Sequence, residues 1–400
     1  MKILQLCNKA PFPANDGSSI AITNLALGLA DNNVELYLLS INTKKHFKPD
    51  ENVSDNFKTK THYKSVYKDT NTSVFGALVN LFSNQSYFVS RFYFTEYENA
   101  LIDLLKVHTF DIIQLEGVFM ASYITTIKKY SSAKITLRSH NIEHQIWDRL
   151  LSQEKNILKK KYLSIQNKRL KRFELNTFER CDAIVTITNE DKKNIQKLFP
   201  HKKIETCLTG ISLIEYKKVS VPVKHNTLFH FAAMDWMPNV EAVNWLLEKV
   251  WIHVINEFPD AQLVIAGRGM PENIKHLQSK NISVIEHVES SFEFYTTYDI
   301  MLVPLWSGSG LRIKLVEGLA YGKAIVTTTI GAEGIPYEKN KHLLIADTDI
   351  EFAEAIKTLL RNEVLKINLQ NNARDLAEQN FDYKKIASKL IEFYNTLLKS

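Results

Sequence analysis

Residues 300–323 read Ile300-Met-Leu-Val-Pro-Leu-Trp-Ser-Gly-Ser-Gly-Leu-Arg-Ile-Lys-Leu-Val-Glu-Gly-Leu-Ala-Tyr-Gly-Lys323. The apolar run at 301–305 has the length of a buried parallel strand. A small-residue turn follows, and leucines then recur at four-residue spacing, which predicts a helix. A strand, a glycine turn and a helix aim unpaired backbone N–H groups at an anion, because the start of a helix carries partial positive charge. The stretch therefore predicts a phosphate site on a parallel α/β sheet.

The charged side chains of this stretch fit the same kind of ligand. Arg312 and Lys314 fall in the first helical turn, where a bound phosphate would offset the unfavourable position of cations near a helix start. The amides of Gly310 and Leu311 would join them around a diphosphate. Glu317 follows one turn later and can accept hydrogen bonds from sugar hydroxyls. A diphosphate that carries a sugar at one or both ends matches this set of groups.

Strand-like and helical segments alternate along both halves of the 400 residues, which predicts two parallel sheets. We expect an α/β protein with two Rossmann-like domains, 1–205 and 226–380, joined by a linker at 206–225 that lacks helical periodicity. A last helix is expected at 381–400. The predicted strands are 2–7, 34–39, 110–116, 134–138 and 181–188 in the first half, and 228–233, 262–266, 283–288, 301–305 and 324–329 in the second.

The residues Gly308-Ser-Gly-Leu-Arg-Ile-Lys-Leu-Val-Glu317 resemble the donor-binding signature of family 4 glycosyltransferases, the glycosyl transferases group 1. The usual signature has two glutamates separated by seven residues. This chain keeps the second as Glu317 and has Ser309 at the place of the first. The resemblance implies the GT-B fold, two doubly wound domains that face each other across a cleft with the last helix crossing back to the first. It also implies that Ser309 lies at the donor and that Glu317 binds the nucleotide ribose.

Candidate residues in the first half follow the ends of strands. Glu116 and His140 come after successive predicted strands, and ligands of open parallel sheets bind beyond the carboxyl ends of strands. The resemblance implies that His140 is the active-site histidine, and that both side chains contact the donor sugar or the acceptor hydroxyl. Gly17 matches the glycine-containing loop that approaches the donor diphosphate in this family; a plain turn glycine is the other interpretation.

Two loops of the second half complete the predicted donor site. Gly267, Arg268 and Gly269 follow the strand at 262–266, and their glycines would let the backbone approach a ligand closely. His287 lies at the end of the strand predicted at 283–288. The run from Gly267 to Glu272 resembles a dinucleotide fingerprint, but it lacks the third glycine and a proline interrupts the required helix, so an NAD enzyme is not expected.

No cofactor and no metal are predicted, because cationic side chains and a helix start would stabilise the diphosphate in place of a metal ion. Asp347-Thr-Asp349 resembles the metal-binding Asp-x-Asp of the other glycosyltransferase fold. It precedes a predicted helix, however, and helix capping is the simpler interpretation.

The net charge of +6 is concentrated in the first half, which has 28 Lys and Arg against 20 Asp and Glu. Within 151–172, eight basic residues accompany one acidic residue, Glu154. Two interpretations stay open: a solvated face of a helix expected over 150–181, or attraction to anionic lipid headgroups or a lipid diphosphate. Nucleic acid is not expected, because no aromatic residues are interleaved with the charges.

The remaining composition predicts a cytoplasmic protein, placed by its basic segment at the inner face of a membrane. The first residues form a short strand-like run and not a signal peptide, and no apolar segment approaches the ~20 residues of a membrane span. Three cysteines without metal spacing indicate buried thiols in a reducing compartment.

The predicted function is a retaining glycosyltransferase that moves a sugar from a nucleotide-diphosphate sugar to a glycan or lipid-linked acceptor in bacterial surface polysaccharide assembly. The resemblance to the family implies this activity, in which Arg312 and Lys314 stabilise the departing diphosphate. Two alternatives stay open. One is a nucleotide-sugar 2-epimerase of the same fold, and the other is a catalytically silent GT-B binding protein, which the serine at 309 makes conceivable.

Overall fold

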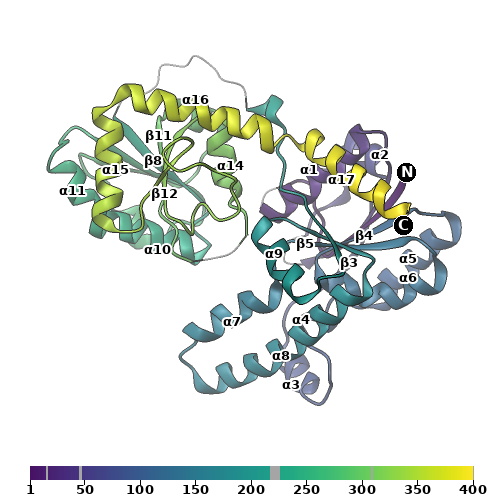
Figure 1. Cartoon of the computed structure of the whole chain (residues 1–400). Coiled ribbons are helices and arrows are strands. Elements are labelled where there is room, and N and C mark those ends of the chain that lie inside the picture. The colour runs from purple at the N-terminus through teal and green to yellow at the C-terminus, as the bar shows by residue number, and fades with distance from the viewer. Residues whose placement is uncertain (15–16, 45–46, 217–225, 308–309, 400) are drawn as a thin grey trace. The chain divides into compact units, whose positions relative to one another are not determined.

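The computed structural model describes residues 1–14, 17–44, 47–216, 226–307 and 310–399, and it divides into two compact units. The first unit is Met1–Gly210 together with Tyr383–Ser400, and the second is Ile211–Asp382 (Figure 1). The predicted boundary at 205 lies five residues before Gly210, inside a strand at Lys203–Thr206 that the sequence did not reveal. Residues 217–225 of the predicted linker lie outside the described residues.

The first unit has a seven-stranded sheet in the order β3-β2-β1-β4-β5-β6-β7, with every neighbouring pair parallel. The strand order reverses between β1 and β4, and ligands of open parallel sheets bind beyond the carboxyl ends of the strands at such a point. Five of the strands were predicted; β3 and β7 were not, because β3 is a short, polar edge strand and β7 is only four residues long. The strands are β1 Lys2–Cys7, β2 Glu35–Thr43, β3 Lys64–Lys68, β4 Ile112–Glu116, β5 Lys134–Ser139, β6 Ala183–Thr186 and β7 Lys203–Thr206.

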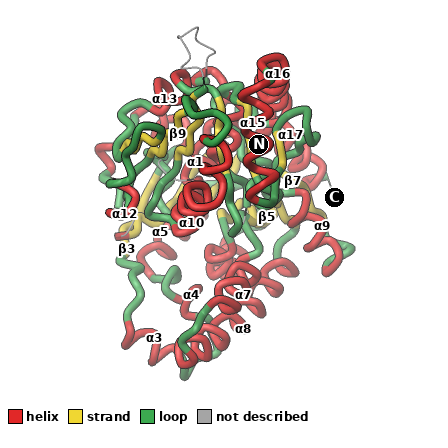
Figure 2. The backbone as a smooth tube through the Cα atoms, turned by 90° about the vertical axis from the view of Figure 1, so that its left-hand side faces the viewer, coloured by secondary structure: helices red, strands yellow, loops and turns green. Residues whose placement is uncertain are grey.

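Helices cover both faces of this sheet (Figures 1 and 2). The prediction of one helix over 150–181 was wrong, because the chain turns at 154–156 and the side chain of Asn156 accepts a hydrogen bond from the backbone N–H of Lys159, which starts a new helix. The helices are α1 Gly17–Asp31, α2 Asp55–Thr61, α3 Val74–Asn80, α4 Tyr87–Ser90, α5 Thr95–Val107, α6 Ile124–Tyr130, α7 Glu143–Gln153, α8 Ile157–Arg180 and α9 Asn189–Leu198, with 3-10 turns η2 Asp50–Asn52 and η3 Val118–Tyr123.

The second unit has a parallel six-stranded sheet in the order β10-β9-β8-β11-β12-β13, which reverses between β8 and β11. The predicted strand, turn and helix at 300–323 are present as β11 and α14. The strands are β8 Thr227–Phe231, β9 Gln262–Ala266, β10 Ile282–Ile285, β11 Ile300–Val303, β12 Ala324–Thr327 and β13 Leu344–Ile345. The helices are α10 Met237–Trp245, α11 Trp251–Ile255, α12 Glu272–Lys275, α13 Ser291–Thr297, α14 Ile313–Ala320, α15 Asp349–Arg361 and α16 Glu363–Asn380, with a 3-10 turn η4 Leu213–Glu215 and a π-helical segment η5 Leu246–Val250.

The two doubly wound sheets confirm the predicted fold class. Cys7, Cys181 and Cys207 are free and buried, as their spacing indicated. Among the described helices, none combines the length and the apolar character that crossing a membrane requires.

The C-terminal helix α17, Tyr383–Leu398, returns to the first unit and packs on α1. Gly28 permits the close approach, because a Cβ at that position would lie 2.7 Å from the carbonyl oxygen of Tyr383 and 2.9 Å from the Cβ of Ala387. At the other end of α17, the hydroxyl of Tyr394 reaches the interior of the sheet, where it lies 3.3 Å from the hydroxyl of Thr136. The last helix is therefore part of the first unit's core.

We predict that Gly28→Ala destabilises the protein, although alanine favours a helix by about 1 kcal/mol over glycine. The added methyl group meets backbone of α17, and overpacking of this kind costs about 1–3 kcal/mol. Urea unfolding of both proteins measures the difference. Lys389→Ala, at an exposed position of α17, is the control and should leave the midpoint unchanged. A Gly28→Ala protein as stable as its parent would contradict the close packing of α1 on α17.

Candidate functional site

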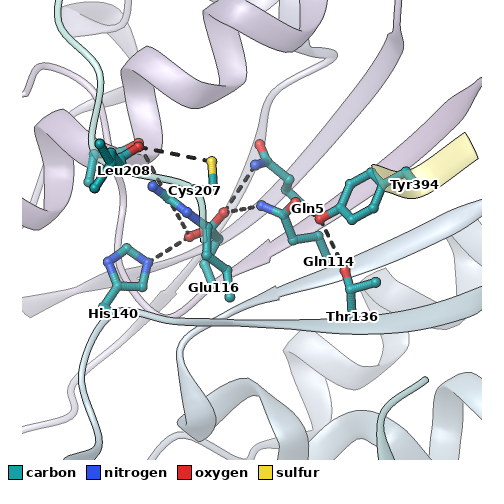
Figure 3. Close-up of polar contacts among 10 residues, drawn as sticks. Gln5, Gln114, Glu116, Thr136, His140, Cys207, Leu208 and Tyr394 are labelled. Atoms are coloured by element: carbon teal, nitrogen blue, oxygen red, sulfur yellow. Dashed lines mark hydrogen bonds and ion pairs between the residues drawn. The ribbon is translucent and has the colours of Figure 1, made fainter. Parts of the chain in front are cut away.

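The carboxyl end of β4 carries a buried carboxylate, that of Glu116. It forms an ion pair with Arg138 on the neighbouring strand β5, with 3.2 Å between Nη1 and Oε2, and both side chains are at most 1% exposed. The Nε2 of His140 lies 2.7 Å from the same oxygen (Figure 3). The structure thus brings together the two first-half residues that were predicted from strand ends, and it adds Arg138, which the sequence placed inside a strand.

The other oxygen of Glu116 is also occupied. Gln5 Nε2 donates to Oε1 at 3.1 Å, Gln114 donates to the same atom, and Gln114 in turn accepts from the hydroxyl of Tyr394 (Figure 3). Burial alone would raise the pKa of Glu116, but the charge of Arg138 and the bond to His140 outweigh it, so the pKa lies below its usual value. The carboxylate is therefore ionised at neutral pH and saturated with partners. The prediction that it also touches a sugar stays a prediction.

His140 is the more accessible member of this cluster, with 14% of its side chain exposed. Burial lowers its pKa, and the charge of Arg138 lowers it further against the opposing effect of Glu116. The ring is therefore neutral at pH 7. Because Nε2 faces a carboxylate, which only accepts, Nε2 carries the proton and Nδ1 keeps a lone pair. His140 can thus accept a hydrogen bond or a proton through Nδ1.

A second buried carboxylate holds the segment after His140. Glu174, on α8, accepts from the backbone N–H groups of Glu143 and His144 at 2.8 and 3.1 Å, and lies 2.6 Å from Nδ1 of His144. Burial and the nearby charge of Glu174 raise the pKa of Glu143 to about 7. Sequence reasoning missed this arrangement, because Glu174 stands 34 positions after His140 in a segment that reads as a surface helix.

In the second unit, Arg312 comes directly before α14 at the carboxyl end of β11. Its side chain is buried; Nη1 donates to the carbonyl of Gly310 at 2.8 Å, and Nη2 lies 3.7 Å from a carboxylate oxygen of Glu333. The guanidinium stands 5.9 Å from the ring centre of Trp236, in the loop after β8. Gly310 has φ 78°, a conformation that glycine adopts without strain. The turn thus fixes one cation at the reversal of strand order.

Lys314, in the first turn of α14, is the second cation at this place. Its ammonium donates to Asn239 Oδ1 at 2.6 Å, and burial together with the charge of Arg312 lowers its pKa to about 7. Behind it, His230 on β8 has a pKa lowered to about 3 by burial and by Lys314. The sequence did not reveal that Trp236, in the loop after β8, and Asn239, in the first turn of α10, contact the two cations. Their place at the end of a central strand was the available signal.

Glu317, one turn further along α14, lies among tyrosines. Tyr216 OH donates to Oε1 at 3.3 Å, and Tyr295 stacks on Tyr321 with 4.6 Å between ring centres. Burial raises the pKa of Glu317 to about 7, against hydrogen bonds from Tyr216 and Tyr295. The carboxyl group is half-buried and already has a hydroxyl partner. Its predicted bond to a ribose stays a prediction.

The other predicted donor residues lie at the same edge of their sheets. A Cβ at Gly267 would come 1.7 Å from the carbonyl oxygen of Ala232, so this close approach of the loops after β8 and β9 requires glycine. Arg268 is exposed and faces Asp235 at 3.7 Å. The remaining predicted residues are Gly269 with φ 69°, Leu311 half-buried before α14, His287 exposed after β10, Gly17 exposed as the first residue of α1, and Ser309, which lies outside the described residues.

The Asp-x-Asp sequence before α15 has structural partners. Asp347 accepts from the backbone N–H of Thr329 at 2.7 Å and from its hydroxyl at 2.6 Å. Thr348 caps α15 through the N–H of Glu351. These contacts account for Asp347 and Thr348 by loop and capping interactions. Within the described ranges, no cluster of three or more His, Cys, Asp or Glu side chains has the arrangement of a metal site.

Two doubly wound sheets, each with its candidate residues at the reversal of strand order, are the architecture of the GT-B fold. The chain superposes over its full length on sucrose-phosphate synthase from Thermosynechococcus elongatus, with TM-score 0.71, 12% identity and 100% of both chains covered. It also superposes on Anabaena HepE in complex with UDP, with TM-score 0.65 and 14% identity over 99% of this chain and 100% of that one. At these identities the superpositions show the fold.

The sequence places the second unit more closely. Residues 225–362 match the family described as Glycosyl transferases group 1, in agreement with the resemblance at 308–317. An uncharacterized 44.6 kDa protein in the cps region of Klebsiella pneumoniae is 26% identical over 299 residues, which cover 71% of this chain and 74% of that protein.

We predict that Glu116→Gln strongly destabilises the first unit. The substitution keeps the shape of the side chain but leaves the charge of Arg138 buried without its counterion, which typically costs about 3–5 kcal/mol. Denaturant unfolding measures the loss. Glu96→Gln, which removes the exposed partner of Lys68, is the matched control and should have little effect. Equal losses in the two variants would show that the buried ion pair is not a main source of stability.

We also predict that binding of a nucleoside diphosphate takes up protons above pH 7. The free Lys314 ammonium has a pKa of about 7, and a bound anion raises it, so at pH 8 a mostly neutral amine becomes protonated on binding. Calorimetry with UDP in buffers of different ionisation enthalpy measures the uptake, and the affinity should fall as the pH rises from 7 to 9. Lys314→Met should remove the uptake. Binding by the parent without proton uptake would contradict the assignment of Lys314 to the diphosphate.

Proposed function

We propose that this protein is a retaining glycosyltransferase that transfers a sugar from a nucleotide-diphosphate sugar to a glycan or lipid-linked acceptor, without a metal ion. The observation that carries the proposal is the pair of cations, Arg312 and Lys314, at the start of α14 in a glycosyl transferases group 1 domain. The complex of HepE with UDP supports a nucleotide donor. The relative in the cps region supports a context in surface polysaccharide assembly.

The donor half of the reaction follows from charge. When the bond between the anomeric carbon and the β-phosphate oxygen breaks, negative charge accumulates on the departing diphosphate. Arg312 and Lys314 stabilise that charge, with the N–H groups of Gly310 and Leu311 and the positive end of α14 beside them. Lys314 is held by a neutral amide, that of Asn239, so binding the phosphate requires no carboxylate to be displaced from it. The pair is thus preorganised for an anion.

The acceptor half is assigned to His140. Its Nδ1 keeps a lone pair and can accept a hydrogen bond from a hydroxyl of the donor sugar or of the acceptor. Glu116 acts through His140, because its carboxylate fixes the tautomer and the orientation of the ring. In a retaining reaction on one face of the sugar, the leaving phosphate serves as the base, so His140 positions and polarises and need not remove the proton itself.

We predict that Arg312→Ala and Lys314→Ala each lower kcat/KM by an amount equivalent to ~2–4 kcal/mol, the loss typical of a missing oxyanion donor. Release of the nucleotide from the cognate sugar donor, with and without acceptor, measures the effect. Lys280→Ala, an exposed lysine of the second unit, is the control and should keep full activity. Rates within tenfold of the parent in both variants would contradict the proposed role.

The donor for that assay comes from thermal-shift screening against UDP, GDP, ADP and their common sugar conjugates without added metal. A ligand at 100 times its Kd should add ~2.7 kcal/mol of stability. A shift with one nucleotide identifies the donor class. No shift with any of them would favour a silent GT-B binding protein, and turnover of the donor to an isomeric sugar without acceptor would favour the 2-epimerase.

A further inference from the structure

Helix α3 presents its apolar side chains to solvent. Phe75, Leu78 and Val79 are 78%, 56% and 53% exposed, and Phe82, in the turn that directly follows the helix, is 96% exposed. The spacing of three and four positions places the first three on one face of the helix, the pattern that normally faces a protein core, and Phe82 adds an exposed ring next to the end of the helix. Two phenylalanines and two aliphatic side chains at this exposure form an apolar stripe, and isolated exposed residues do not explain it.

The opposite side of α3 is firmly held, so the stripe has a defined direction. Arg169, on α8, donates to the carbonyls of Asn80 and Leu81 at 3.0 and 2.9 Å. Gln166 Nε2 donates to Asn80 Oδ1 at 3.1 Å, and the hydroxyl of Tyr87 accepts from the backbone N–H of Ser73. Both views show α3 beside α8, in a lobe that projects from the sheet of the first unit (Figures 1 and 2). The contacts to α8 use the polar side and the backbone of α3, and leave the apolar stripe uncovered by this unit.

The surroundings of the stripe are cationic. No acidic residue occurs between Asp69 and Glu96, and none between Glu154 and Glu174, where eight Lys and Arg are found. Seven of the eight are exposed, all but Arg169. Among them, Lys161, Lys168 and Arg172 repeat at helical spacing with the 37% exposed Ile165, so they form one outward row along α8. A second exposed apolar pair, Ile157 and Leu158, each 80% exposed, begins the same helix.

We propose that α3 and α8 form a docking surface for an anionic lipid bilayer. The apolar stripe of α3 enters the boundary between headgroups and acyl chains, where aromatic side chains are favoured, and the row of cations on α8 faces the headgroups. A bilayer fits this surface because it supplies negative charge and apolar depth together and requires no complementary shape. The inference is independent of the donor chemistry and uses none of the residues assigned to it.

Flotation with vesicles of phosphatidylcholine alone, and of phosphatidylcholine with one quarter phosphatidylglycerol, tests the proposal. The parent protein should bind the anionic vesicles in low salt and much less in high salt. Phe75→Ser with Phe82→Ser should lower the partition coefficient at least about tenfold, since two aromatic side chains lose their apolar burial. Lys161→Gln with Lys168→Gln should weaken binding and reduce its dependence on salt.

The matched control replaces two exposed apolar residues of the second unit, Ile350→Ser with Val364→Ser, which are 54% and 69% exposed, and should bind as the parent does. The aromatic variant, Phe75→Ser with Phe82→Ser, must have the same unfolding midpoint and the same thermal shift with the nucleotide as the parent. A loss of vesicle binding then reflects a change of the surface alone. Anionic vesicles that fail to bind the parent, or that bind the aromatic variant equally well, would overturn the proposal. A parent that is dimeric in solution, and becomes monomeric in the aromatic variant without any vesicle binding, would overturn it in favour of a contact between copies.

Discussion

The first unit is organised around the buried ion pair of Glu116 and Arg138. Arg138 connects β5 to β4 and, through the carbonyl of Ala21 at 3.3 Å, to α1. Glu116 receives Gln5 from β1 and Gln114 from β4, and Gln114 accepts from Tyr394 on α17. A charge placed in the centre of a sheet requires partners on every side, so this pair determines how the strands next to the reversal of order and the returning helix come together. The orientation of His140 follows from the same demand.

The charged group at the centre of the second unit, Lys314, has a different environment. Lys314 donates to an amide, and its pKa is lowered to about 7 because burial and the charge of Arg312 outweigh the opposing effect of Glu317. A buried carboxylate with a complete set of partners stabilises the fold, whereas a cation whose surroundings disfavour its charge can gain stability from an anionic ligand. Under the proposed function, this contrast gives Glu116 a positioning role and Lys314 a binding role. The pKa shifts show the same contrast. The pKa of Glu116 is lowered, which favours its charged form, and the pKa of Lys314 is lowered, which favours its neutral form.

The sequence predicted the alternation of strands and helices well, because buried parallel strands are apolar runs that stand out from their surroundings. It missed β3 and β7, which are short and partly exposed and whose pairing depends on neighbours far along the chain. The two cations at the start of α14 were found because they adjoin a strand–turn–helix pattern in one stretch of the sequence. Asn239 and Glu174 were missed, because each acts on a residue tens of positions away. A site whose residues are close together in the sequence can be predicted from the sequence, but the partner of a buried charge depends on which strands and helices are neighbours in the fold.

The lobe of α3 and α8 is a second example of what the sequence alone does not reveal. The exposed apolar residues of α3 stand at helical spacing, and by the usual rule their common face would be the buried one. Here α3 is attached by backbone carbonyls and polar side chains to α8, and the apolar face remains exposed. Periodicity tells which residues share a face, but it does not tell what covers that face. The lack of acidic residues in both segments is the additional information. A helix face that is buried in a protein core does not require its surroundings to lack acidic residues, whereas a surface that meets negative charge and hydrocarbon together does.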